Sequence, residues 1–199
     1  MYSIESSLLS DGYKYICGTD EAGAGPLAGP VYAAAVILNK DCIIEGLNDS
    51  KKLSEKKRDM LFDIITKEAV CYSIVSVDEK VIDEINILQA RMLAMRLAVQ
   101  SLKIKPDILL VDGNSDPKAE IESLCIIGGD GKSASIAAAS ILAKVSRDRF
   151  MKEKALEYPQ YGFEKHKGYG TKQHISAIKE YGASPIHRRT FLTKICDEK

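Results

Sequence analysis

The chain has 199 residues, of which 45% are hydrophobic and 28% charged, and its formal net charge is zero. This composition is typical of a soluble globular protein, and we expect one domain over residues 1–199. No apolar run approaches the length of a membrane span, and the N-terminus lacks the features of a secretory signal. We therefore expect a cytoplasmic protein with no membrane partner.

The charge is unevenly distributed along the chain. Residues 1–129 carry 14 Lys and Arg against 20 Asp and Glu, whereas residues 130–199 carry 14 against 8. A basic segment of this density can bind a polyanion, but a solvated helix face would give the same counts. Both interpretations stay open on charge alone.

Cysteines and histidines give little sign of a structural metal site. The five cysteines are odd in number, scattered, and mostly flanked by apolar residues, which favours free thiols in a reducing compartment. The three histidines show no zinc-ligand spacing. The cysteines are Cys17, Cys42, Cys71, Cys125 and Cys196, and the histidines are His166, His174 and His187.

The first half of the chain predicts strands at about 13–19, 31–38 and 69–77. Ser54 is a candidate N-cap for a helix to about residue 67, and a second, amphipathic helix follows the third strand. The side chains expected to face the core are Met60, Leu61, Ile64 and Ile65 in the first helix and Ile85, Leu88, Met92, Met95 and Val99 in the second.

The second half predicts short buried strands at 107–111 and 124–127, after Pro106 stops the preceding helix. A small-residue helix follows Gly131 and ends before Pro159, and another covers about 172–181. Five strands interspersed with helices indicate an α/β sheet covered on both faces. From about residue 158 the chain forms a helical C-terminal appendage.

Two glycine-rich stretches resemble nucleotide-binding loops but depart from them. Residues 23–28 fit a loose dinucleotide pattern, yet prolines surround it and a strand follows instead of a helix. The segment Gly131-Lys132-Ser133 ends like a phosphate-binding loop, but Ile126 stands at its first glycine position and Asp130 would repel phosphate. A helix start at this point can still direct its amides toward an anion.

Four acids lie where an apolar run meets a glycine-rich turn: Asp20, Glu21, Asp112 and Asp130. If these stretches converge, their oxygens suit Mg²⁺ or Mn²⁺, and two such ions can promote attack on a phosphate. Any one of them alone is better explained as a turn former or helix cap. Neighbours on a strand point to opposite faces, so Glu21 contributes only indirectly unless the chain bends near Ala22-Gly23.

Five segments, in order and across nearly the whole chain, resemble the ribonuclease HII family. They are GTDEAGAGPLAGPV (18–31), NDSKKLS (48–54), LVDGN (110–114), AAASILAKVSRD (137–148) and HKGYGT (166–171). The resemblance implies an RNase H-like fold with a mixed five-stranded sheet, flanking helices and a helical C-terminal appendage. It also implies a metal-dependent endonuclease that cuts the RNA strand of RNA/DNA hybrids and cleaves 5′ of single ribonucleotides embedded in duplex DNA.

By position, the four acids of the family fall on Asp20, Glu21, Asp112 and Asp130, which are expected to be catalytic and to hold two Mg²⁺ or Mn²⁺ ions. The products would carry 5′-phosphate and 3′-hydroxyl ends. Asp148 is the competitor for the fourth position, but its neighbours Arg147 and Arg149 favour local ion pairs on a helix. We expect a monomer whose partners are RNA/DNA hybrids and ribonucleotide-containing DNA duplexes.

The loop Gly23-Ala24-Gly25 matches the segment that contacts the ribose 2′-hydroxyl, largely through its backbone. The family usually has arginine where this chain has Ala24, so phosphate affinity and the preference for an isolated ribonucleotide are in question. Tyr169 matches a tyrosine near the following sugar, and Lys51 is a candidate phosphate contact; each is otherwise an ordinary surface residue. His166 is a weaker candidate for proton transfer.

A different class of function also fits part of the sequence. The segment 131–133 and the basic C-terminal third would suit a non-catalytic hybrid-binding or nucleotide-binding module. A nuclease variant with weakened ribonucleotide recognition, caused by Ala24, is a further alternative. Binding without metal-dependent turnover would indicate the non-catalytic module.

Overall fold

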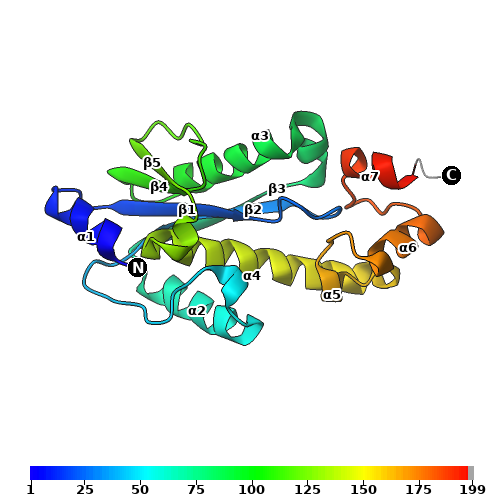
Figure 1. Ribbon diagram of the computed structural model, residues 1–199, viewed down its shortest axis with the longest axis horizontal. Helices are drawn as coiled ribbons and strands as arrows, with labels where there is room; N and C mark the ends of the chain where they lie inside the picture. Colours follow the sequence, from blue (N-terminus) through cyan, green and yellow to red (C-terminus); the bar gives the residue numbers. More distant parts are fainter. Residues whose placement is uncertain (197–199) are drawn as a thin grey trace.

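A computed structural model describes residues 1–196 and shows a five-stranded mixed sheet with helices on both faces (Figure 1). The strand order is β3-β2-β1-β4-β5. Strand β2 is antiparallel to both β1 and β3, whereas β4 is parallel to both β1 and β5. The strands are β1 (Ile16–Ala22), β2 (Val31–Ile37), β3 (Cys71–Val77), β4 (Ile108–Asp112) and β5 (Ser123–Ile126). The predicted sheet is confirmed.

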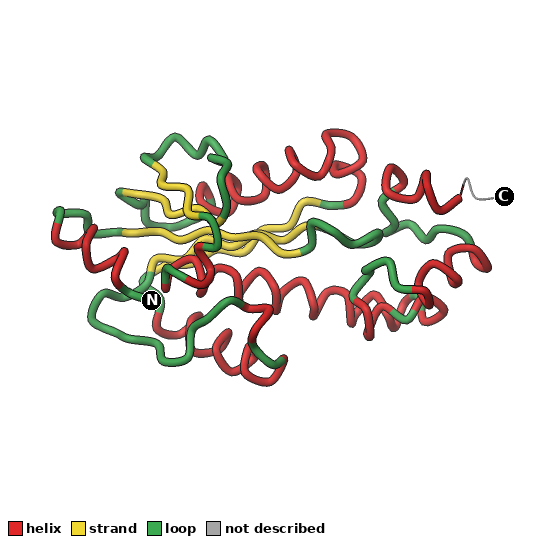
Figure 2. The backbone as a smooth tube through the Cα atoms, viewed as in Figure 1, coloured by secondary structure: helices red, strands yellow, loops and turns green. Residues whose placement is uncertain are grey.

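The helices form two layers and an appendage (Figures 1 and 2). Helix α3 (Glu79–Gln100) covers one face of the sheet, and α4 (Ala134–Glu157) covers the other, with α2 (Glu55–Glu68) packed outside it. The short helix α1 (Ser3–Ser10) precedes β1. The appendage contains α5 (Phe163–His166), α6 (Lys172–Tyr181) and α7 (Arg189–Cys196), and 3-10 turns occur at η1 (Ser50–Lys52), η2 (Gly129–Gly131) and η3 (Pro159–Tyr161).

Small residues bring α4 directly against the central strand. The alanines at 137, 138 and 139 are fully buried on the sheet. A Cβ added to Gly18 of β1 would lie 2.1 Å from the carbonyl carbon of Ser135 in α4, so only glycine fits there. Because side chains alternate along a strand, Asp20 points to the same face of the sheet as Gly18. The strand thus delivers Asp20 to the α4 side.

Two predicted core positions are wrong. Leu88 in α3 is 50% exposed and Met60 in α2 is 45% exposed. Helix α3 is interrupted at Asn86, whose φ of 66° is left-handed and whose side chain accepts a hydrogen bond from the amide of Gln89. The helix restarts there, so the apolar stripe does not continue in phase from Ile85. In α2, only the narrower stripe through Leu61 and Ile65 is fully buried.

The start of α4 is occupied by a carboxylate of the chain itself. Glu5, on the unpredicted helix α1, is only 6% exposed, and its Oε1 accepts hydrogen bonds from the Ser133 hydroxyl (2.6 Å) and the Ser135 amide (2.9 Å). The Lys132 ammonium donates to the carbonyl of Ile127. The amides at this helix start do meet an anion, as expected, but that anion is Glu5 and not a phosphate.

In the part of the chain that the structure describes, no helix is long and apolar enough to cross a membrane. Four cysteines are free thiols: Cys17 and Cys71 are buried, and Cys42 and Cys125 are half-buried. The side chain of Cys196 lies outside the described residues.

Gly18→Ala should destabilise the fold strongly, because its methyl group would overlap backbone atoms of α4 and force the helix from the sheet. We expect the free energy of unfolding to fall by about 1–3 kcal/mol, the usual range for overpacking. Urea denaturation measures this change. Gly131→Ala is the control, since nothing lies within 4 Å of a Cβ at that position. Equal stability of the two variants would contradict the close contact between β1 and α4.

Candidate active site

Two of the predicted acids lie on neighbouring parallel strands, Asp112 as the last residue of β4 and Asp20 near the end of β1. Thr19 of β1 is paired with Val111 of β4, so Asp20 and Asp112 follow side by side and point toward α4. The Oδ1 atom of Asp20 accepts a hydrogen bond from the Glu21 amide (2.7 Å). Asp112 accepts one from the Gly129 amide (2.7 Å), which ties η2 to the end of β4. This register places Asp20 and Asp112 next to each other on the sheet.

The acids influence each other's ionisation. Burial, followed by the charges of Glu21 and Asp112, raises the pKa of Asp20 well above its usual range. Burial, followed by the charges of Asp112 and Asp49, raises the pKa of Asp130. Mutual repulsion of this kind requires the carboxylates to share one environment. Asp130 from η2 therefore joins the acids of β1 and β4.

Glu21 belongs to the same environment but faces the other side of the sheet. It remains paired with Ala33 of β2, and the chain leaves strand geometry only at Gly23, where φ is 99°. Its Oε1 atom lies 2.6 Å from Nη2 of Arg91 on α3, while its Oε2 atom is buried without a partner. Burial raises the pKa of Glu21, Arg91 opposes the rise, and the charge of Asp112 adds to it.

The four acids are held by protein contacts and do not form a closed set of ligands. Among residues 1–196, no three His, Cys, Asp or Glu side chains are grouped so that they could hold a metal ion as they stand. Asp112 is bonded to the Gly129 amide and Glu21 to Arg91. Coordination of a cation would therefore require these side chains to adjust.

Lys51 lies within reach of the acids. It is exposed at η1, where its amide donates to the side chain of Asp49 (2.9 Å). Partial burial would lower the pKa of Lys51, but the charges of Asp20, Asp130, Asp49 and Asp112 together raise it. The Lys51 ammonium is therefore in the same electrostatic environment as these carboxylates.

The glycine loop after β1, residues 23–25, is held in place by hydrogen bonds from Arg188. This guanidinium donates hydrogen bonds to the carbonyls of Gly23 (2.6 Å), Ala24 (2.9 Å) and Gly29 (2.9 Å). The amides of Gly23, Ala24 and Gly25 have no hydrogen-bond partner among the described residues. The loop thus uses its carbonyls internally and leaves its N–H groups available to a ligand.

A second buried guanidinium, that of Arg147 in α4, links the same loop to the appendage. It donates to the carbonyls of Ala28 (3.1 Å), Pro30 (3.1 Å) and Lys167 (3.0 Å). Arg147 and Arg188 are at most 1% exposed, and neither pairs with a carboxylate in the described part of the chain. Burial, followed by the charge of Arg147, lowers the pKa of Arg188 to about 9.

Tyr169 lies beside the glycine loop on the α5–α6 connection. Its ring atom Cε1 would be 3.7 Å from a Cβ on Gly25, and the side chain is 46% exposed. The Tyr169 carbonyl accepts from Nδ1 of His174 (2.9 Å), whose Nε2 lies 3.0 Å from Nε2 of His187. Since Nδ1 of His187 accepts from the Ser184 amide, its Nε2 must donate to His174. Two neutral imidazoles thus hold the Tyr169 backbone.

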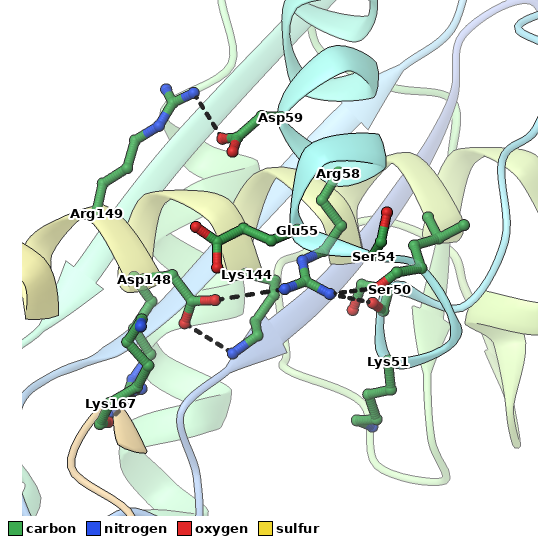
Figure 3. Close-up of polar contacts among 12 residues, drawn as sticks. Ser50, Lys51, Ser54, Glu55, Arg58, Asp59, Lys144, Asp148, Arg149 and Lys167 are labelled. Carbon is green, nitrogen blue, oxygen red and sulfur yellow. Dashed lines mark hydrogen bonds and ion pairs between the residues drawn. The ribbon is translucent and has the colours of Figure 1, made fainter. Parts of the chain in front are cut away.

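Asp148 does not compete for the acidic site, as expected. Its carboxylate lies 2.7 Å from the Lys144 ammonium and 3.8 Å from the guanidinium of Arg58, both drawn in Figure 3. The same view shows Arg149 paired with Asp59 at 3.1 Å. Several cations of the basic C-terminal third are therefore already paired or buried. The net charge of this third overstates the surface available to a polyanion.

His166 also has a structural environment. Its Nε2 lies 2.8 Å from the carbonyl of Tyr161, and its Nδ1 accepts a hydrogen bond from the Gly168 amide. Both ring nitrogens are therefore engaged with backbone groups, and His166 is not placed to transfer protons.

Comparison with known proteins agrees with this geometry. The family model of ribonuclease HII matches residues 17–194. The chain belongs to the ribonuclease HII family. The curated ribonuclease HII of Caldicellulosiruptor bescii is 58% identical over 98% of this chain and 94% of its own length. That of Caldicellulosiruptor saccharolyticus is 57% identical over 98% and 95%.

Solved structures of the family share the fold. The ribonuclease H2 of Pyrococcus horikoshii superimposes with a TM-score of 0.76 at 30% identity, covering 92% of this chain and 97% of that one. The RNase HII of Archaeoglobus fulgidus, solved in a complex with PCNA, gives 0.76 at 25% identity, covering 88% and 94%. The expected RNase H-like fold is confirmed. The chain is therefore a ribonuclease H, a nuclease for RNA in RNA/DNA hybrids.

The residues that support the site were not predicted from the sequence. Nothing in the sequence singles out Arg91, and Asp49 occurs only within one of the family-like segments. Arg147 and Arg188 were counted among the basic residues. Arg147 and Arg188 stand beside other charged or polar residues in the sequence, so no local pattern marks them as buried.

The buried imidazoles should make stability depend on pH. Burial lowers the pKa values of His174 and His187 to about 4 from 6.5. The folded state therefore binds fewer protons than the unfolded state between these values, and stability present above pH 6.5 is lost as the pH falls toward 4. Urea midpoints between pH 7 and 4.5 should fall less in His187→Gln than in the unmodified protein. His166→Gln should keep the full pH dependence, and an identical dependence in all three proteins would contradict the assignment.

Proposed function

We propose that Asp20, Glu21, Asp112 and Asp130 hold two Mg²⁺ or Mn²⁺ ions and that the enzyme cuts on the 5′ side of ribonucleotides. The observation that carries the proposal is the parallel register of β1 and β4, which sets Asp20 beside Asp112, together with the Gly129 amide bond to Asp112 (2.7 Å), which brings η2 and Asp130 to the same end of the sheet. The products would have 5′-phosphate and 3′-hydroxyl ends. Both RNA/DNA hybrids and DNA duplexes with an embedded ribonucleotide would be substrates.

The residues present fit divalent cations. Glu21 Oε2 is a buried carboxylate oxygen with no partner, and such an atom is costly unless something binds it. Burial and neighbouring charges oppose ionisation of Asp20, and a cation between the carboxylates would reverse that effect. An oxygen-only set suits Mg²⁺ or Mn²⁺ rather than zinc. When bound, such ions stabilise charge on the phosphate oxygens and activate water.

The chain's own groups would orient the substrate. Arg188 holds the loop carbonyls and leaves the amides of residues 23–25 unused, and backbone N–H groups of this kind would bond a ribose hydroxyl. The Tyr169 ring, beside Gly25, would pack against the adjacent sugar. Lys51 would contact a phosphate near the carboxylates. Together these contacts would select a ribonucleotide and fix the scissile bond.

Asp112→Asn should abolish most cleavage, because it removes a charge shared by all the other acids while keeping an oxygen that can accept from Gly129. The assay is Mg²⁺-dependent cutting of a duplex with one embedded ribonucleotide, run beside an RNA/DNA hybrid. We expect kcat to fall by at least about 100-fold, which is the usual effect of removing one group that stabilises charge in the transition state. Asp116→Asn, in the following loop, is the matched control. Undiminished cutting by Asp112→Asn would refute the assignment.

Ala24→Arg should tighten binding of the embedded-ribonucleotide duplex. A guanidinium bonded to a phosphate contributes about 1.5–3 kcal/mol, so KM should fall roughly tenfold or more with little change in kcat. Ala24→Gln supplies similar length without charge and should change KM much less. Steady-state kinetics on both substrates measures the effect. An unchanged KM in the arginine variant would show that residue 24 does not approach a phosphate.

A further inference from the structure

Arg91 is a charged residue that reaches the active site from the opposite face of the sheet. It lies on α3, and its Nη2 atom is 2.6 Å from Oε1 of Glu21. The two side chains are only 31% and 11% exposed. A charge-assisted hydrogen bond of this length in a shielded position fixes the orientation of the carboxylate. Arg91 is thus the main constraint on where Glu21 points.

Only one oxygen of the Glu21 carboxylate contacts the Arg91 guanidinium. Arginine and carboxylate often pair through two parallel hydrogen bonds, which satisfy both oxygens. Here Oε2 of Glu21 and Nε of Arg91 are both buried without a partner. The guanidinium therefore secures one oxygen and leaves the other with its lone pairs unused. Glu21 directly follows Asp20 in β1, and its amide donates to Oδ1 of Asp20 (2.7 Å), so the unused oxygen is on the residue adjoining the acids of β1 and β4.

We infer that Arg91 is a positioning residue for metal binding: it holds Glu21 by Oε1 so that Oε2 remains available to a divalent cation. The inference rests on the proposed function, because it requires Glu21 to contribute a ligand. Groups that hydrogen-bond a ligating carboxylate orient it, and their removal typically weakens metal affinity about 10–100-fold. Arg91 would supply this support from α3, while Asp20 and Asp112 are positioned on the α4 side.

Simple electrostatics predicts the opposite sign. A cation close to the site repels a divalent metal ion, so deleting it should strengthen metal binding. Positioning predicts weaker binding after the same deletion. The two effects are therefore distinguished by the direction of the change and not only by its size.

The test is calorimetric titration of the full chain with Mn²⁺, without substrate. We expect Arg91→Gln to weaken Mn²⁺ binding about tenfold or more. Arg96→Gln is the matched control, because Arg96 lies on the same helix and has no hydrogen bond or ion pair within residues 1–196. It should leave the affinity within about twofold, since the half-buried Arg96 makes no contact with any of the four acids. Arg91→Lys, which keeps a donor and the charge, should restore part of the loss.

A second readout uses cleavage at increasing Mn²⁺. In Arg91→Gln the half-saturating Mn²⁺ concentration should rise, while the rate at saturating Mn²⁺ approaches that of the unmodified enzyme. Unchanged or tighter Mn²⁺ binding by a folded Arg91→Gln overturns the inference and leaves the proposed function intact. If Arg91→Gln does not fold, Arg91→Lys decides, with an unchanged affinity counting against the inference. No Mn²⁺ binding by the unmodified protein overturns the proposed function itself.

Discussion

Hydrogen bonds from two buried guanidiniums to backbone carbonyls connect the parts of this enzyme that must act together. Arg147 and Arg188 satisfy six carbonyls with their charged groups, which is how a buried cation avoids a large desolvation penalty without a carboxylate. Arg147 belongs to the sheet-covering α4, whereas Arg188 comes from the appendage. Between them lies the loop that follows Asp20 and Glu21. The position of Asp20 and Glu21 relative to Tyr169 therefore depends on these contacts.

The sequence was most informative where local chemistry determines structure. Ser54 caps α2 by accepting from the Lys57 amide, and Ser133 caps α4 by accepting from the Ile136 amide. The acids at strand ends could be placed because parallel strands end at one edge of a sheet, and the fold followed from the order of strands and helices. The sequence also indicated that Glu21 and Asp20 would point to opposite faces of the sheet, because side chains alternate along β1.

What the sequence could not supply were contacts between residues distant in the chain. Nothing local pairs Arg91 with Glu21, 70 positions earlier, or places Glu5 at the start of α4. The exposed Leu88 depends on a single left-handed residue, Asn86, whose conformation is not evident from a continuous apolar pattern. The His174–His187 pair forms only when α6 and the segment before α7 pack together. Each of these features is a product of tertiary packing.

Arg188 donates hydrogen bonds only to main-chain oxygens of the glycine loop. The contacts that hold this loop therefore do not involve the side chain at position 24. Ala24 is half-buried, and its side chain is not part of the support. Exchanging residue 24 therefore leaves the contacts that hold the loop intact. Main-chain atoms maintain the fold at this position, and the side chain is left free to differ.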